Sequence, residues 1–121
     1  MTTSRQRMAT GGYGEATAAR HLVEQGMVVL DRNWRCEQGE IDLVLRDGEV
    51  LVFCEVKTRA SAAYGGPLES VTATKVARLR RLGARWMQER GVHVHDVRLD
   101  LVGVLLDRGG EARLEHVRGV G

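Results

Sequence analysis

The stretch GEIDLVLRDGEVLVFCEVKTR, residues 39–59, decides the fold of this 121-residue chain because it has the pattern of one β-hairpin. Its two halves are rich in Val, Ile, Leu and Phe, which suit a buried, pleated surface. Between them, the dipeptide Asp-Gly at 47–48 indicates a two-residue type I′ turn, in which both central residues need positive φ. We therefore predict two antiparallel strands that meet at residues 47–48.

This register distributes the hairpin side chains over two faces, because residues alternate along a strand and cross-strand partners share a face. Glu40 is then predicted to face Glu55, and Asp42 to face Phe53. One predicted face is apolar throughout and carries Ile41, Leu43, Leu45, Val50, Val52, Cys54 and Val56. At the open end of the other face the pattern gathers the charged residues Glu40, Asp42, Glu55 and Lys57.

Carboxylates held this close together repel one another, so either some of them bind protons or a cation lies between them. Lys57 offsets one charge, and a divalent ion such as Mg²⁺, which prefers oxygen ligands, would offset more. The alternative is a solvated strand face with cross-strand Glu–Lys pairs. The apolar residues Val44, Leu51 and Phe53 on the same face count against that alternative, because they indicate a partly covered surface.

Asp42, followed after a turn by Glu55-Val56-Lys57, resembles the PD-(D/E)xK nuclease signature. The wider sequence is similar to the YraN family, a bacterial family that resembles Holliday-junction resolvases and restriction endonucleases. The segments that carry this resemblance are GYGE (12–15), GEIDLV (39–44), LVFCEVKTR (51–59) and YGGPLESVTATK (64–75). The resemblance covers about residues 11–118. Gly39 departs from the wider superfamily, which often has proline before the acid.

The resemblance implies a restriction-endonuclease-like core and a metal-dependent endonuclease acting on DNA, including branched or structured DNA. Asp42, Glu55 and the carbonyl of Val56 would bind Mg²⁺ or Mn²⁺, and Lys57 would orient or help to deprotonate the attacking water. Glu40 or Glu15 would hold a second ion or position a water. For Glu15 an alternative stays open, since a carboxylate in the first turn of a helix is favoured by the helix dipole.

The composition fits one domain, predicted at residues 11–118 after a flexible tail at 1–10. Aromatic residues make up only 4% of the chain, which argues against a surface that stacks single-stranded bases. The net charge is only +2, so affinity for nucleic acid must come from a local patch. The candidates for that patch are Arg32, Arg35, Arg59, Lys75 and Arg78. A homodimer is left open.

Two cysteines far apart in sequence, Cys36 and Cys54, make no disulfide framework and no zinc pattern. The first ten residues lack the apolar core of a signal peptide. No apolar run approaches the roughly 18 residues of a membrane span. We therefore expect a cytoplasmic protein without a membrane partner.

The expected fold class is α/β, with a mixed sheet of about five strands flanked by helices. Outside the hairpin we predict a helix from Gly12 or Tyr13 to Gln25, a strand over 27–30, a polar connection over 33–36, a loop over 58–67, a helix over 70–90, and strands over 97–106 and 112–117. The strand–helix–strand order after the hairpin predicts a parallel strand pair. Since a fold does not determine a function, two rivals to the enzyme remain, a non-catalytic nucleic-acid-binding module and an interaction protein.

Overall fold

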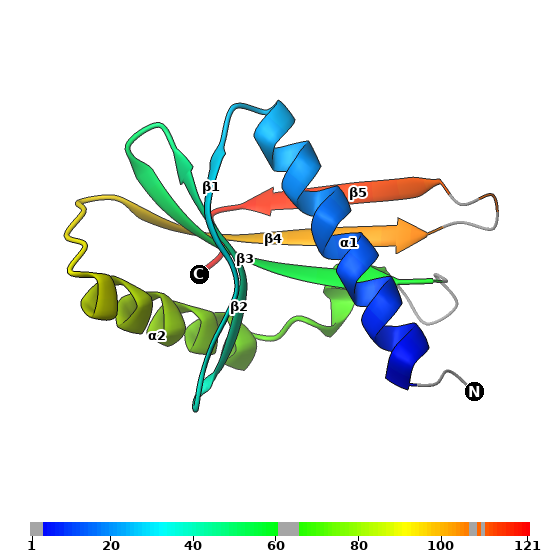
Figure 1. Cartoon of the computed structure of the whole chain (residues 1–121), viewed down its shortest axis with the longest axis horizontal. Coiled ribbons are helices and arrows are strands. Elements are labelled where there is room, and N and C mark those ends of the chain that lie inside the picture. The colour runs from blue at the N-terminus through cyan, green and yellow to red at the C-terminus, as the bar shows by residue number, and fades with distance from the viewer. Residues whose placement is uncertain (1–3, 61–65, 107–108, 110) are drawn as a thin grey trace.

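The hairpin lies in the middle of a five-stranded sheet with the spatial order β1-β2-β3-β4-β5. The computed structural model describes residues 4–60, 66–106, 109 and 111–121 (Figure 1). Along the chain the elements are α1 (Ser4–Glu24), β1 (Val28–Cys36), β2 (Gly39–Asp47), β3 (Val50–Arg59), the 3₁₀ helix η1 (Pro67–Ser70), α2 (Ala73–Arg90), β4 (Val97–Leu106) and β5 (Ala112–Arg118). This order of helices and strands is the predicted one.

Strands β3 and β4 are parallel, and the other neighbouring pairs are antiparallel. A parallel pair needs a long crossover, which η1 and α2 provide. Helix α1 packs on one face of the sheet and α2 on the other (Figure 1). The predicted α/β fold with a mixed five-stranded sheet is confirmed, and it is consistent with a restriction-endonuclease-like core.

The predicted hairpin register is wrong by two residues. Asp47 pairs with Val50, so the turn consists of Gly48 and Glu49, and Val44 rather than Asp42 lies opposite Phe53. Gly48 has a φ of 62°, whereas the only non-glycine residue with positive φ in the described chain is Asn33. Positive φ at the first central position alone is the pattern of a type II′ turn. A shift by two residues keeps the paired residues of the hairpin, 43–47 and 50–54, on their predicted faces.

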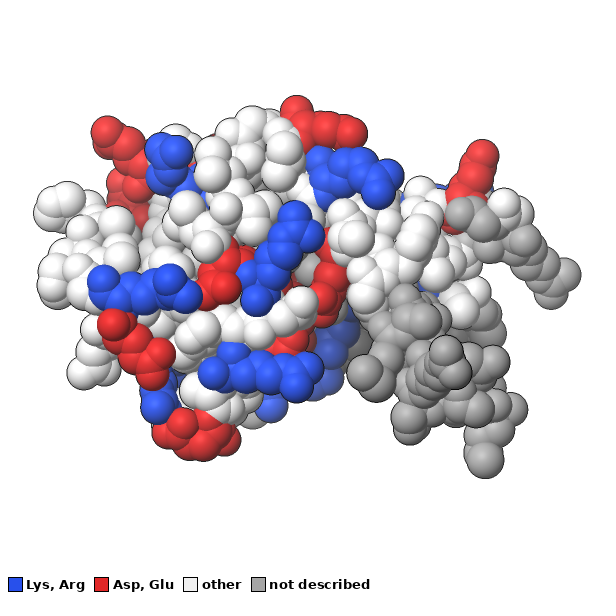
Figure 2. Space-filling model, in the orientation of Figure 1, with Lys and Arg blue, Asp and Glu red and all other residues white. Residues whose placement is uncertain are grey.

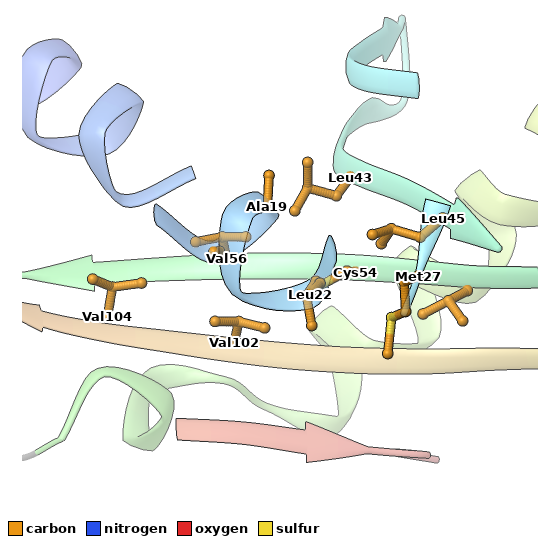
Figure 3. Close-up of a cluster of buried hydrophobic side chains, with 11 residues drawn as sticks. Ala19, Leu22, Met27, Leu43, Leu45, Cys54, Val56, Val102 and Val104 are labelled. Carbon is orange, nitrogen blue, oxygen red and sulfur yellow. The ribbon is translucent and has the colours of Figure 1, made fainter. Parts of the chain in front are cut away.

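A separate hydrophobic core covers each face of the sheet. The core on the α1 side, shown in Figure 3, contains Ala18, Ala19, Leu22, Met27, Leu43, Leu45, Val52, Cys54, Val56, Val102 and Val104. The core on the α2 side contains Ile41, Val44, Leu51, Phe53, Leu79, Leu82, Trp86 and Leu99. The prediction for Ile41 is therefore wrong, because it lies on the face opposite to Leu43. The alternation of β2 breaks between these two residues, where β2 leaves β3.

Two predicted boundaries are also wrong. Helix α1 begins at Ser4 rather than near Gly12, so most of the expected tail is helical. Residues 4–12 contain no proline, and a helix tolerates a glycine pair at a cost of about 1 kcal/mol per residue. Strand β1 extends through the expected polar connection to Cys36, because backbone pairing with β2 outweighs its polar composition.

Helix α2 ends at Arg90 as predicted, and Gly91 after it has a left-handed φ of 63°. It begins at Ala73 rather than Ser70, since the hydroxyl of Thr72 caps it by accepting a hydrogen bond from the Lys75 amide at 3.3 Å. A loop was predicted over 58–67. Its first two residues belong to β3, and residues 61–65 lie outside the described part of the chain. No helix in the described part of the chain is both long and apolar enough to cross a membrane.

Candidate metal centre

Strands β2 and β3 separate at the open end of the hairpin and leave a fork between them. Their ladder ends at the pair Leu43–Cys54, after which β2 continues beside β1 and β3 beside β4. The side chain of Asp42 enters this fork, and its Oδ2 accepts a hydrogen bond from the Val56 amide at 2.7 Å. A carboxylate thus takes the place that a backbone carbonyl of β2 would occupy in a continuous ladder.

The backbone of Val56 also presents its carbonyl to the fork. In an extended strand the N–H and C=O groups of one residue point to the same edge. Since the Val56 amide points at Asp42, its carbonyl oxygen points to the same side, beyond the last β2–β3 pair. The fork therefore offers a carboxylate and a carbonyl oxygen side by side.

Helix α1 adds Glu15 to this place. One oxygen each from Glu15, Glu40 and Asp42 lie within 4.8 Å of one another. The helix comes this close because residue 14 is glycine: a Cβ added there would lie 1.8 Å from Oγ1 of Thr58 in β3. Any side chain at that position would push α1 away from the sheet and carry Glu15 away from Asp42.

The surroundings of Asp42 favour its protonated form. Burial raises the pKa of Asp42, although the hydrogen bond from Val56 opposes the rise. The charges of Glu15, Glu55 and Glu40, in that order, also raise the pKa, which reaches about 7. Without a cation, the fork therefore holds a carboxyl group that gives up its proton only near neutral pH.

Strand β1 forms the neighbouring wall of the cluster. Arg35 pairs with Glu40 in the ladder, and its Nε donates a hydrogen bond to Glu40 Oε2 at 3.1 Å. Burial raises the pKa of Glu15 and the charge of Glu40 raises it further, while hydrogen bonds to Asp42 and Asn33 oppose the rise. Asn33 was not among the predicted site residues, because residues 33–36 were expected to form a connection. The strand periodicity of β1, which places Asn33 beside Arg35 on one face, was the signal available for it.

Glu55 and Lys57 lie on the other side of the β3 backbone. Their neighbours Cys54 and Val56 pack in the α1-side core, so alternation directs Glu55 and Lys57 to the α2 side. Lys57 Nζ lies 3.4 Å from Glu55 Oε1, and their side chains are 29% and 17% exposed. The predicted acidic set is thus divided: Asp42 lies in a compact group with Glu15 and Glu40, while Glu55 acts on Asp42 through its charge across the fork.

The basic candidates come from three elements, with Arg32 and Arg35 on β1, Arg59 at the end of β3, and Lys75 and Arg78 on α2. Arg78 of α2 lies beside Gly39, since its Cδ would be 3.9 Å from a Cβ placed there. Arg32 and Arg59 are exposed, and Lys75 is half-buried in the first turn of α2. Figure 2 shows Lys and Arg side chains interspersed with Asp and Glu on the face that carries α1. The binding role of these residues stays a prediction.

Comparison with known proteins assigns the chain to a family. The family described as "Uncharacterised protein family UPF0102" matches residues 14–104. The chain belongs to this family. A UPF0102 protein from Nocardioides sp. JS614 is 66% identical over 95% of this chain and 93% of its own length. Another from Beutenbergia cavernae is 58% identical over 97% of this chain and 99% of its own. The resemblance to the YraN family is thereby confirmed.

The donor set of this UPF0102 chain fits a hard divalent cation. Carboxylate oxygens from Asp42, Glu15 and Glu40 lie together, Asp42 also contacts the backbone of Val56, and Mg²⁺ takes carboxylate and carbonyl oxygens together with waters. A divalent ion would also remove the repulsion that raises the pKa of Asp42. Glu55, on the far side of the β3 backbone, completes the predicted metal-ligand set only if its side chain turns toward the fork.

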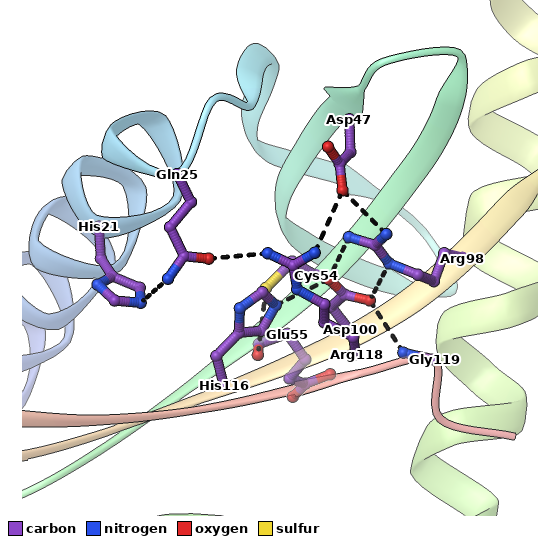
Figure 4. A network of polar contacts seen from close by, with 10 residues as sticks. All are labelled: His21, Gln25, Asp47, Cys54, Glu55, Arg98, Asp100, His116, Arg118 and Gly119. Atoms are coloured by element: carbon purple, nitrogen blue, oxygen red, sulfur yellow. Dashed lines mark hydrogen bonds and ion pairs between the residues drawn. The ribbon is translucent and has the colours of Figure 1, made fainter.

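A second polar cluster of the UPF0102 chain, near the end of α1, was not predicted (Figure 4). Its centre is the fully buried Asp100 of β4. Burial alone would raise the pKa of Asp100, but hydrogen bonds from Arg98, His116 and the Gly119 amide outweigh it and hold the pKa below its ordinary value. Arg98 also donates to Asp47 Oδ2 at 3.0 Å. The cluster therefore ties the hairpin turn to β4 and β5, which is a structural role.

Proposed function

We propose that this UPF0102 protein is a metal-dependent nuclease that hydrolyses phosphodiester bonds in DNA. The observation that carries the proposal is the fork between β2 and β3. There the carboxylate of Asp42 meets the backbone of Val56, with Glu55 and Lys57 on either side of that residue. A half-buried carboxyl group whose pKa is raised by other carboxylates, in a notch of the sheet, is typical of a site that accepts a cation.

The residues take separate roles in this proposal. Asp42, the Val56 carbonyl and, with its side chain turned toward the fork, Glu55 would hold Mg²⁺ or Mn²⁺, which supplies positive charge to the scissile phosphate when bound. Lys57 is half-exposed at the rim, where it orients the attacking water and assists its deprotonation. Glu15 and Glu40 position a second water or hold a second ion at the α1 side of the fork.

Contacts to the phosphate backbone would come from the basic side chains around the hairpin. Arg35 forms an ion pair with Glu40 of the acidic cluster, and Arg78 lies beside Gly39, the residue before Glu40. Arg32, Arg59 and Lys75 extend the binding surface in this proposal. Such contacts position a nucleic acid and carry no sequence information. Branched or structured DNA is the substrate that the YraN resemblance favours.

A cleavage assay tests the proposal. Single-stranded, duplex and four-way-junction DNA would be incubated with the parent and with Lys57→Ala, in Mn²⁺ and in chelator. We expect chelator-sensitive cleavage by the parent and a loss of about 10²- to 10⁴-fold in the variant, the range for a general acid–base group. Thermal melts would show that the variant is folded, because Lys57 lies at a rim and not in a core. Cleavage by the variant at the parent rate would remove Lys57 from the mechanism.

The same assay addresses the rival proposal. The ion pairs Arg35–Glu40 and Lys57–Glu55 neutralise two of the carboxylates without a metal ion. This is expected of a protein that binds DNA but does not cleave it. Binding to the panel without cleavage in Mn²⁺ would therefore assign the non-catalytic module.

A further inference from the structure

Asn33 of β1 stands directly across from Asp42. The β1–β2 ladder pairs the residues on either side of Asn33 with those on either side of Asp42. Cross-strand neighbours share a face, so the two side chains lie next to each other. The following pair on that face is Arg35 with Glu40, which form an ion pair. Glu15 of α1 lies over this array, within 4.8 Å of Asp42 and Glu40 through one oxygen of each.

The backbone of Asn33 is left-handed, with a φ of 51°, and this is the only positive φ of a non-glycine residue in the described chain. Glycine adopts such a φ without the steric penalty that a Cβ brings. Asparagine, whose short polar side chain forms local hydrogen bonds, is among the few other residues that adopt this conformation. The side chain of Asn33 lies close enough to Glu15 to lower the pKa of its carboxyl group.

We propose that Asn33 is a positioning residue that holds the Glu15 carboxylate beside Asp42 in the metal centre. The presence of a metal in this inference rests on the proposed function, whereas the interaction between Asn33 and Glu15 requires no cation. The amide would hold the Glu15 carboxylate at the place where it meets Asp42 and Glu40. In metal sites generally, such outer partners orient the ligands and raise affinity.

Two substitutions separate the side chain from the backbone. Asn33→Gly removes the amide and keeps, or relaxes, the left-handed conformation, so it should leave the fold intact. Gln38→Ala, in the β1–β2 turn, is a matched control that removes an exposed amide elsewhere on the same strand pair. Mn²⁺ binding would be measured by calorimetry. We expect about 10- to 100-fold weaker binding for Asn33→Gly and parent affinity for Gln38→Ala.

A double-mutant cycle in chelator tests the contact without any metal. Urea unfolding of the parent, Asn33→Gly, Glu15→Ala and the double variant should show midpoint shifts that do not add, because each single change removes the same hydrogen bond. Additive shifts, or parent Mn²⁺ affinity in Asn33→Gly, would overturn the inference. A parent that binds no Mn²⁺ would overturn the proposed function instead, and the cycle would still decide the role of Asn33.

Discussion

At the residue scale, Asp42 is a carboxyl group that prefers a proton when no cation is present. Its pKa is raised from 3.8 to about 7, first by burial and then by the neighbouring carboxylates. In the unfolded chain the pKa returns to its ordinary value. The folded state therefore binds this proton more tightly than the unfolded state does. The resulting stabilisation is fully present below about pH 4 and is lost as the pH rises through about 7.

This sign gives a prediction for the metal-free protein. In chelator, the free energy of unfolding of the parent should fall between pH 4 and pH 8, by at most about 1.4 kcal/mol for each pH unit. Asp42→Asn keeps the shape and removes the titrating group, so its stability should fall much less. Urea titrations of both proteins across this range provide the measurement. Identical pH profiles for the two would show that Asp42 does not titrate as described.

The buried Asp100 gives a second prediction. Asp100→Ala leaves Arg98 and His116 without their shared acceptor in the interior, and breaking a buried ion pair on one side destabilises by about 3–5 kcal/mol. The control is Asp96→Ala, an exposed carboxylate just before β4, which should change stability by no more than about 0.5 kcal/mol. If chemical denaturation gave the same loss of stability for Asp100→Ala and Asp96→Ala, the buried hydrogen bonds of Asp100 would contribute no more to stability than an exposed carboxylate does.

The acidic residues of the hairpin could be predicted at this scale because alternation depends on sequence alone. Glu40, Asp42 and Glu55 were placed on one face, but Glu40 and Asp42 lie with Glu15 of α1, whereas alternation directs Glu55 to the α2 side. The split of Glu55 from the other two could not be predicted, since it results from the separation of β2 from β3. Asn33 was missed because residues 33–36 were expected to form a connection, and Asp100 because His116 and Gly119, two of its partners, are distant in sequence.

At the element scale, the approach of α1 to β3 decides whether Glu15 reaches the fork. Gly14→Ala would place a Cβ 1.8 Å from Thr58 Oγ1, and such overpacking destabilises by about 1–3 kcal/mol. Gly12→Ala is the matched control in the same helix, because a Cβ there meets nothing within 4 Å. It should stabilise by up to about 1 kcal/mol through helix propensity. Thermal melts that move in the same direction for both variants would contradict this account of the contact.

The elements themselves were predictable where local signals are strong. The glycine after Arg90 ended α2 at the predicted residue, and β4 runs over the predicted range. The signals failed where partners decide the outcome. Strand β1 forms from a polar segment because β2 lies beside it. The turn lies at Gly48-Glu49 because Asp47 pairs with Val50, and Gly48 supplies the positive φ that a type II′ turn needs at its first central position.

At the scale of the whole molecule, the low net charge of +2 means that affinity for DNA depends on a few side chains. Each phosphate contact contributes about −0.9 to the slope of log K against log salt for duplex DNA. Arg78→Gln, beside the fork, should weaken binding and make this slope shallower by about that amount. Arg113→Gln, on the edge strand β5, should leave both unchanged. Fluorescence anisotropy at several salt concentrations measures the slope. Binding that changes neither with salt nor with Arg78→Gln would show that the proposed basic surface does not bind DNA.

The most direct measurement of the central claim, that Asp42 binds a divalent cation in the fork, is a set of thermal melts. The parent and Asp42→Asn would be melted in chelator and in Mn²⁺ at a hundredfold excess over the parent dissociation constant. A ligand that binds only the folded state stabilises it by about 2.7 kcal/mol at that excess. We predict this gain in stability for the parent, and we predict that Asp42→Asn loses most of it. In chelator at neutral pH, the variant should be at least as stable as the parent. Equal Mn²⁺-induced shifts in the two proteins would contradict the claim.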